Sequence, residues 1–164
     1  MAGLKLEIAQ EPPFASLEEE ALLNLLRTSD CLNRAFHVRT REWGVTSTQY
    51  NVLRILRGAH PNGLTCSAIG SRMIAAEPDI TRLLSRLKAL KLIRQQRDPH
   101  DRRVVRTKIS ETGLDLLRKM DPVIQRFPVE LLGHLEDAEV AELIRLLELA
   151  RKPIADTQAD GEPI

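Results

Sequence analysis

Residues 78–109, PDITRLLSRLKALKLIRQQRDPHDRRVVRTKI, contain the pattern that decides the fold. Apolar residues at positions 80, 83, 84 and 87 recur at the spacing of a helix that buries one face. Pro78 suits the first turn of this helix, because the N–H group that proline lacks is not needed there. Residues 92–97 and 104–109 fit two strands, and the polar loop DPHDRR between them predicts a β-hairpin with a projecting tip.

Two further helices are predicted before this segment. Thr46 and Gln49 have the spacing of a capping box that starts one helix, and Thr65 caps a shorter one that extends through Met73. Three short helices followed by a hairpin with a basic tip predict a winged helix-turn-helix lobe, which we assign to residues 45–112. A B-form major groove admits one helix, and a hairpin beside that helix can reach the adjacent backbone or minor groove.

Longer helices flank the predicted lobe. Ser16 starts a helix that runs to about residue 41, within a predicted dimerisation region at residues 17–44. The leucine-rich segment 113–152 supplies C-terminal dimerisation helices. Leucine-rich helices of this kind need an apolar partner, and pairing with a second copy is favoured over packing on the first long helix alone. The predicted fold is therefore mainly α with a small β-hairpin.

Prolines and polar ends limit these outer helices. Pro122 and Pro128 should kink or divide the C-terminal region, because an interior proline removes a hydrogen bond and clashes with the preceding turn. Residues 1–16 are predicted to form a flexible arm, and residues 153–164 a flexible tail.

Positive charge is concentrated in the centre of the chain. The 164 residues have a formal net charge of only +1, but residues 72–108 carry eleven Lys or Arg against four acids. Residues 121–164 carry four basic residues against ten acidic ones. A basic segment between acidic ends is typical of a protein that presents one face to a polyanion, although a charge run can also be a solvated face.

Composition argues against several other classes of protein. The five aromatic residues are too scattered for a single-strand RNA platform, and neither a membrane span nor a signal peptide is recognisable, so we expect a soluble cytoplasmic protein. The two cysteines and four histidines have no metal-ligand spacing, so no metal or cofactor is expected. Catalytic motifs are also missing, and we do not expect an enzyme.

The motifs in their order resemble the MarR (multiple antibiotic resistance regulator) family of bacterial transcription factors. The resemblance spans about residues 17–150 and is carried by VTSTQYNVL at 45–53, ITRLLSRL at 80–87, Leu92-Ile93, DPHDRR at 98–103 and ISETG at 109–113. It implies a homodimer with interlocking terminal helices that binds double-stranded DNA at a pseudo-palindromic operator. It also implies a repressor that a small-molecule effector releases.

The resemblance assigns DNA contacts to the recognition helix and the wing. These residues are Pro78, Asp79, Thr81, Arg82, Ser85, Arg86, Arg102 and Arg103. Arg82 is the strongest candidate, because its planar fork of donors can bond guanine edges or phosphate. Asp98 and Asp101 are expected to hold the hairpin and orient Arg102 and Arg103, with the alternative that one of these arginines serves only the Asp residues.

Three positions depart from the usual family pattern. Ala76 stands where a serine-type cap is common, and Lys91 stands where a glycine usually follows the recognition helix. Asp79 replaces a neutral or small residue. A carboxylate there can accept a hydrogen bond from cytosine but is repelled by phosphate, so the sequence preference should differ from that of the family.

Regulation is expected at the junction of the lobe and the first long helix. The resemblance implies a small aromatic or phenolic effector near Phe36, His37, Arg39, Trp43 and Tyr50, with ordinary core and hinge roles as the alternative. Cys31 is a candidate redox switch, with a buried structural cysteine as the alternative. A winged-helix module that binds another protein, and DNA only weakly, is the second functional hypothesis. Concentrated arginine favours the DNA-binding one.

Overall fold

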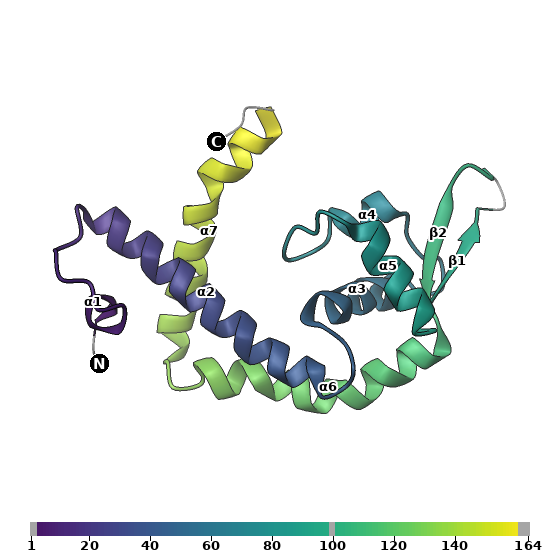
Figure 1. Ribbon diagram of the computed structural model, residues 1–164, viewed down its shortest axis with the longest axis horizontal. Helices are drawn as coiled ribbons and strands as arrows, with labels where there is room; N and C mark the ends of the chain where they lie inside the picture. Colours follow the sequence, from purple (N-terminus) through teal and green to yellow (C-terminus); the bar gives the residue numbers. More distant parts are fainter. Residues whose placement is uncertain (1–2, 99–100, 161–164) are drawn as a thin grey trace. The chain divides into compact units, whose positions relative to one another are not determined.

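A computed structural model describes residues 3–98 and 101–160, with side chains to residue 153. The elements are α1 (Leu4–Glu7), α2 (Leu17–Arg41), α3 (Ser47–Gly58), α4 (Cys66–Gly70), α5 (Ile80–Ala89), β1 (Ile93–Arg97), β2 (Val105–Ile109), α6 (Glu111–Leu132) and α7 (Asp137–Asp160), as labelled in Figure 1. The contacts divide the chain into two units, residues 1–120 and 121–164. The predicted mainly helical fold with one hairpin is confirmed.

Side-chain caps start the helices at the positions that the sequence predicted. The Ser16 hydroxyl accepts a hydrogen bond from the Glu19 N–H at 3.2 Å. Thr46 accepts from the Gln49 N–H at 3.1 Å, and the Gln49 side chain accepts from the Thr46 N–H at 2.9 Å, which completes the capping box. Thr65 caps α4, but this helix ends at Gly70 and not at Met73, since glycine is a poor helix former.

Three helices of the lobe bury a common apolar core. Leu53 and Leu56 of α3, Ile69 of α4, and Leu84 and Leu87 of α5 are at most 1% exposed. These residues recur at the predicted helical spacing, so burial of one face of each helix holds the lobe together.

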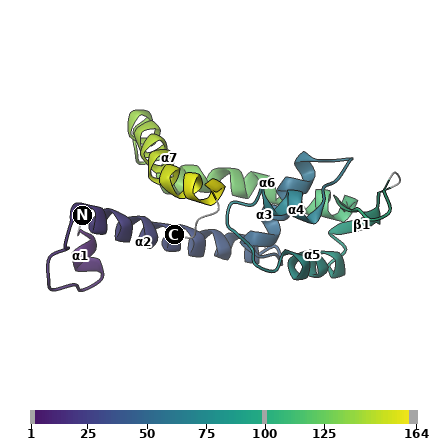
Figure 2. The same ribbon diagram turned by 90° about the horizontal axis from the view of Figure 1, so that it is seen from above.

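The hairpin packs one face against this core. Ile93 pairs with Ile109 and Arg97 with Val105 in antiparallel register, and both isoleucines are buried. Leu64 extends the sheet by two backbone hydrogen bonds to Thr107, of 2.9 and 2.7 Å. Figures 1 and 2 show the far end of the hairpin extending away from α3, α4 and α5. The wing (residues 93–109) therefore projects from the lobe as predicted.

Ser110 connects the end of α5 to the start of α6. Its hydroxyl donates to the Lys91 carbonyl at 2.7 Å and accepts from the Gly113 N–H at 3.1 Å. Lys91 adopts a left-handed conformation with φ of 60°. The usual family residue at this position, glycine, adopts that conformation without strain, so Lys91 is held there at a cost.

The predicted flexible arm contains one turn of helix. Leu4 in α1 is 5% exposed, and Glu7 lies 3.8 Å from Arg27 of α2 in an ion pair. Burial of a leucine explains why this part of the arm is ordered.

The C-terminal helices are longer than predicted, because α6 is not divided at its prolines and α7 extends into the predicted tail. Helix α6 passes through Pro122 and Pro128 without a break, and α7 continues through Pro153 to Asp160, where a tail was predicted. Each proline removes only one hydrogen bond. Ile124 and Phe127 beside the first two prolines are buried, which favours continuation of α6.

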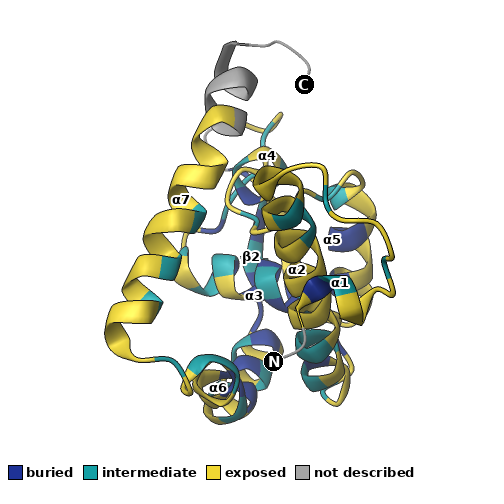
Figure 3. Cartoon of the chain, turned by 90° about the vertical axis from the view of Figure 1, so that its left-hand side faces the viewer, coloured by how far each residue is buried: buried dark blue, intermediate teal, exposed yellow. Residues whose placement is uncertain are grey.

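The long terminal helices are largely uncovered. Thr40 is the only buried residue of α2, whereas Leu17, Leu22 and Leu26 are 56–81% exposed. The described part of α7 has no buried side chain and is coloured as exposed or intermediate in Figure 3. These faces lack an apolar partner within the described part of the chain.

Candidate DNA-binding site

The recognition helix α5 presents a polar face opposite its buried one. Leu83, Leu84 and Leu87 are buried, while the predicted contact residues on the helix are exposed: Thr81, Arg82, Ser85 and Arg86. Pro78, which precedes the helix, is also exposed. The predicted division of α5 into a core face and an outward face is confirmed.

The two arginines of this face are free to bind a ligand. Within the described residues neither the Arg82 nor the Arg86 guanidinium has a carboxylate partner. The Ser85 hydroxyl instead donates to the Thr81 carbonyl of its own helix at 2.9 Å. Two unpaired guanidinium groups one helical turn apart provide strong donors for phosphate or base edges.

Asp79 has a structural role that the sequence analysis did not assign. Its carboxylate accepts a hydrogen bond from the Arg82 N–H at 2.9 Å, so Asp79 is the N-cap of α5. Pro78 therefore precedes the cap and does not lie in the first turn as predicted. An N-cap side chain bonds the backbone N–H three residues further along the chain. The sequence therefore already offered Asp79, three residues before Arg82, as the cap instead of position 76.

Two aspartates organise the tip of the wing. Asp98 pairs with the Arg106 guanidinium and also accepts from the Asp101 N–H at 3.4 Å. Asp101 accepts from the backbone N–H of Arg103 at 2.9 Å. The ion pair thus involves Arg106, which the sequence analysis did not select. Positions 99 and 100 lie outside the described residues.

The wing arginines, like those of α5, are available to bind DNA. Arg102 and Arg103 are exposed, and neither guanidinium group has a carboxylate partner among the residues described, which argues against the alternative that either side chain serves only the Asp residues. Arg97 is a further exposed arginine that was missed. Strand alternation places it on the face of Ile93, and β1 packs against α5 on that face.

The five predicted effector residues do not form one group. Phe36 and Tyr50 pack edge to face with ring centroids 5.6 Å apart, and Arg54 lies 6.0 Å from the Tyr50 ring. Tyr50 is 4% exposed, so this pair belongs to the contact between α2 and α3. His37 and Arg39 lie on the same helix as Phe36 and are half-buried.

Trp43 instead lines a separate cavity of about 430 Å³. Val45, Leu90, Leu92 and Leu116 form apolar walls, and Thr112, Asp115 and Lys119 add polar groups. The indole N–H of Trp43 is buried and has no acceptor among the described residues. An unsatisfied buried donor costs about 1–3 kcal/mol.

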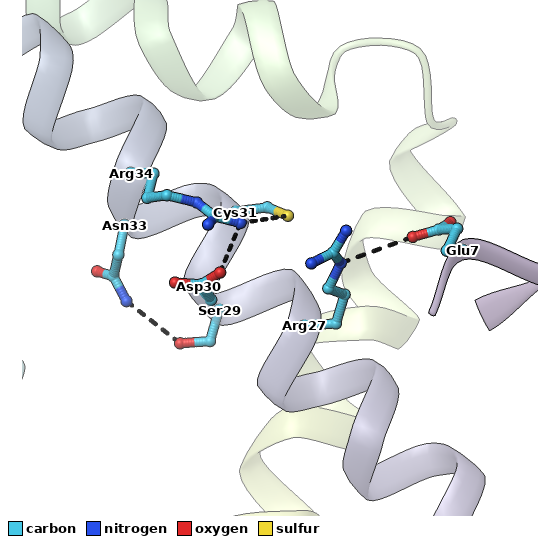
Figure 4. A network of polar contacts seen from close by, with 7 residues as sticks. All are labelled: Glu7, Arg27, Ser29, Asp30, Cys31, Asn33 and Arg34. Carbon is cyan, nitrogen blue, oxygen red and sulfur yellow. Dashed lines mark hydrogen bonds and ion pairs between the residues drawn. The ribbon is translucent and has the colours of Figure 1, made fainter. Parts of the chain in front are cut away.

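Cys31 lies on the surface of α2, not in a core. Figure 4 shows its sulfur beside Arg34, whose guanidinium donates to it at 3.8 Å. The same guanidinium forms an ion pair with Asp30 at 2.6 Å. The alternative that Cys31 is buried is wrong for the single chain. The Asp30 carboxylate offsets the positive charge of the Arg34 guanidinium beside the Cys31 thiol. The redox role of Cys31 stays a prediction.

The described residues contain neither a metal-binding cluster nor a membrane-spanning helix. No three His, Cys, Asp or Glu side chains gather in residues 3–98 and 101–153. No helix in this part of the chain is long and apolar enough to cross a bilayer.

Comparison with known proteins agrees with this geometry. Residues 43–104 match the profile of the MarR family. A solved MarR transcription factor from Planctomyces limnophilus is 39% identical, with 84% of this chain and 99% of that chain covered and a TM-score of 0.64. The HTH-type transcriptional regulator MhqR of Bacillus subtilis is 27% identical over 73% of this chain and 79% of its own length.

A third relative is known with a bound molecule. The PcaV transcriptional regulator of Streptomyces coelicolor, solved in complex with its natural ligand, is 25% identical, with 90% of this chain and 98% of that chain covered and a TM-score of 0.66. The profile match covers the lobe as far as residue 104, and the likeness to the Planctomyces protein extends over most of the chain. The chain therefore belongs to the MarR family of winged helix-turn-helix transcriptional regulators.

Proposed function

We propose that the protein is a homodimeric repressor that binds a pseudo-palindromic DNA operator in the cytoplasm and is released by a small-molecule effector. The exposed face of α5 carries the proposal, because Arg82 and Arg86 have no carboxylate partner in the described chain while the opposite face is buried. In the operator complex α5 lies in the major groove, and Arg102 and Arg103 contact the adjacent backbone or minor groove.

The exposed apolar faces of α2 and α7 support the proposed dimer. Leu22 and Leu26 on α2, and Ile144 on α7, are 52–58% exposed. A second copy would cover these side chains and supply a second lobe related by two-fold symmetry. Two such lobes suit two half-sites about one helical turn apart.

Substitution of Arg82 tests the DNA-binding face. Arg82→Ala should weaken binding to the selected operator by about 1–3 kcal/mol and reduce discrimination between operator and random DNA. Arg118→Ala is the matched control, because Arg118 lies on α6 and pairs with Asp115 at 2.6 Å. Titration of labelled duplex with each variant measures the difference. Equal affinities of wild type and Arg82→Ala would contradict the assignment.

The effector site that the geometry favours is the cavity beside Trp43. Its apolar walls suit an aromatic ring, while Lys119, which has no carboxylate partner among the described residues, suits an anionic acceptor such as a carboxylate. The PcaV structure with its natural ligand supports effector binding within the family.

Tryptophan fluorescence tests this site directly. Trp43 is the only tryptophan of the chain, so its emission reports on the cavity alone. Benzoate, used as a probe, should change this emission in a saturable way and weaken operator binding. Lys119→Gln should reduce both effects without loss of operator affinity in the absence of benzoate. Release of DNA by benzoate with unchanged Trp43 emission would place the effector elsewhere.

A further inference from the structure

An exposed apolar segment leads into the recognition helix. Ile74 is 88% exposed, more than any other large hydrophobic residue of the described chain. Ala75 and Ala76 follow it and are also exposed. Three consecutive exposed apolar residues are unfavourable in water unless they contact a partner.

This segment is held in place. The Ile74 backbone N–H donates to the Asn51 side chain of α3 at 3.1 Å, although the two residues are 23 positions apart. On the other side, the Glu77 carboxylate accepts from the Asp79 N–H at 3.4 Å, and Asp79 caps α5. The isoleucine side chain is therefore presented to solvent by a backbone that is tied to α3 at the Ile74 N–H.

The position of the segment favours DNA as the partner. The first residues of a recognition helix approach base edges, and the segment runs directly into that end of α5. The major-groove edge offers one apolar group, the C5-methyl of thymine. Glu77 and Asp79 beside the segment are repelled by phosphate, so an approach to base edges is favoured over an approach to the backbone.

We propose that Ile74 packs against a thymine methyl group in each operator half-site and thereby helps to set sequence specificity. The inference rests on the proposed DNA-binding function. The inference adds a DNA contact from a residue outside α5 and the wing. It assigns to Ile74 the recognition of the thymine methyl group.

Replacement of thymine by uracil removes only the methyl group and so tests the contact. With wild-type protein, uracil at one thymine of each half-site should weaken binding by about fifteenfold, as expected for the loss of two buried methyl groups at about fourfold each. Ile74→Ser should bind the thymine operator about as weakly as the wild-type protein binds the uracil operator. Its affinity should not fall further when uracil replaces that thymine. Ala75→Ser, which keeps the isoleucine, should retain the sensitivity.

Other outcomes overturn the inference. A wild-type protein that binds the operator but tolerates uracil at every position contradicts the Ile74 contact and leaves the proposed function intact, as does an Ile74→Ser variant that keeps the wild-type sensitivity. If Ile74→Ser changes the oligomeric mass and not DNA affinity, the segment contacts protein. If the wild-type protein selects no duplex, the proposed function fails and this inference fails with it.

Discussion

Helices α3 and α2 differ in where their side chains lie. The 12-residue α3 buries five residues, whereas the 25-residue α2 buries only Thr40. Both helices have a sequence rich in leucine, but only α3 is surrounded by other elements of the lobe. The lobe therefore supplies its own core, whereas the terminal helices leave most of their apolar side chains exposed. The contrast agrees with the proposal that the lobe binds DNA and that the terminal helices pair with a second copy.

The largest expected effect on stability comes from a substitution in the core of the lobe. Leu53→Ala removes a fully buried side chain and should lower the free energy of unfolding by about 2–5 kcal/mol. Leu26→Ala, which starts from a side chain that is 58% exposed, should lower it far less in dilute protein. Denaturant unfolding at low protein concentration measures both. Equal losses would contradict the contrast between the two regions.

A charged residue on α2 tests whether the exposed apolar face of this helix forms the proposed dimer interface. Leu26→Asp would bury an unpaired carboxylate in the proposed dimer interface, which is unfavourable, but should leave the lobe unchanged. The dimer should weaken by at least about tenfold, as measured by sedimentation equilibrium. The helix content of the variant should stay that of the wild type. A wild-type dimer affinity would show that this face of α2 is not the interface.

The cap of α5 gives a smaller effect within the lobe. Asp79→Ala should lower the free energy of unfolding by about 1 kcal/mol, because the Arg82 N–H loses its acceptor. Asp79→Asn keeps a capping oxygen and removes the charge. It should therefore retain stability while binding DNA more tightly at low salt, and operator titration checks this. Weaker binding by Asp79→Asn would indicate a direct contact of the carboxylate with a base.

The smallest effect concerns the turn after α5. Lys91→Gly should raise the free energy of unfolding by about 0.5–1 kcal/mol, because glycine adopts the observed φ of 60° without strain. Lys88→Gly inside α5 also removes a lysine ammonium group, but it should lower the free energy of unfolding by about 1 kcal/mol, because glycine is a poor helix former. Thermal unfolding distinguishes the two signs. A loss of stability in Lys91→Gly would mean that the lysine side chain has a stabilising contact.

Local features of the fold were predictable, and features that depend on distant residues were not. Ser16, Thr46 and Thr65 were identified as caps, because a cap involves residues only three positions away. The pairing of Asp98 with Arg106 depends on the hairpin register, and the separation of Trp43 from the Phe36–Tyr50 pair depends on packing. The continuity of α6 through Pro122 was missed for the same reason.

The candidate site follows a similar division. Helical spacing was sufficient to place Arg82 and Ser85 on the outward face of α5. Strand alternation could have identified Arg97 on the wing. Ile74 carries no motif, and only its exposure and its hydrogen bond to Asn51 distinguish it.

Selection of bound duplexes from random DNA is the most direct test of the whole account. Two lobes joined by their terminal helices should enrich an inverted repeat with half-site centres about one helical turn apart. Enrichment of a single half-site without its inverted copy would contradict the dimeric arrangement. Enrichment of no sequence, with binding that depends only on salt, would contradict sequence-specific recognition by α5.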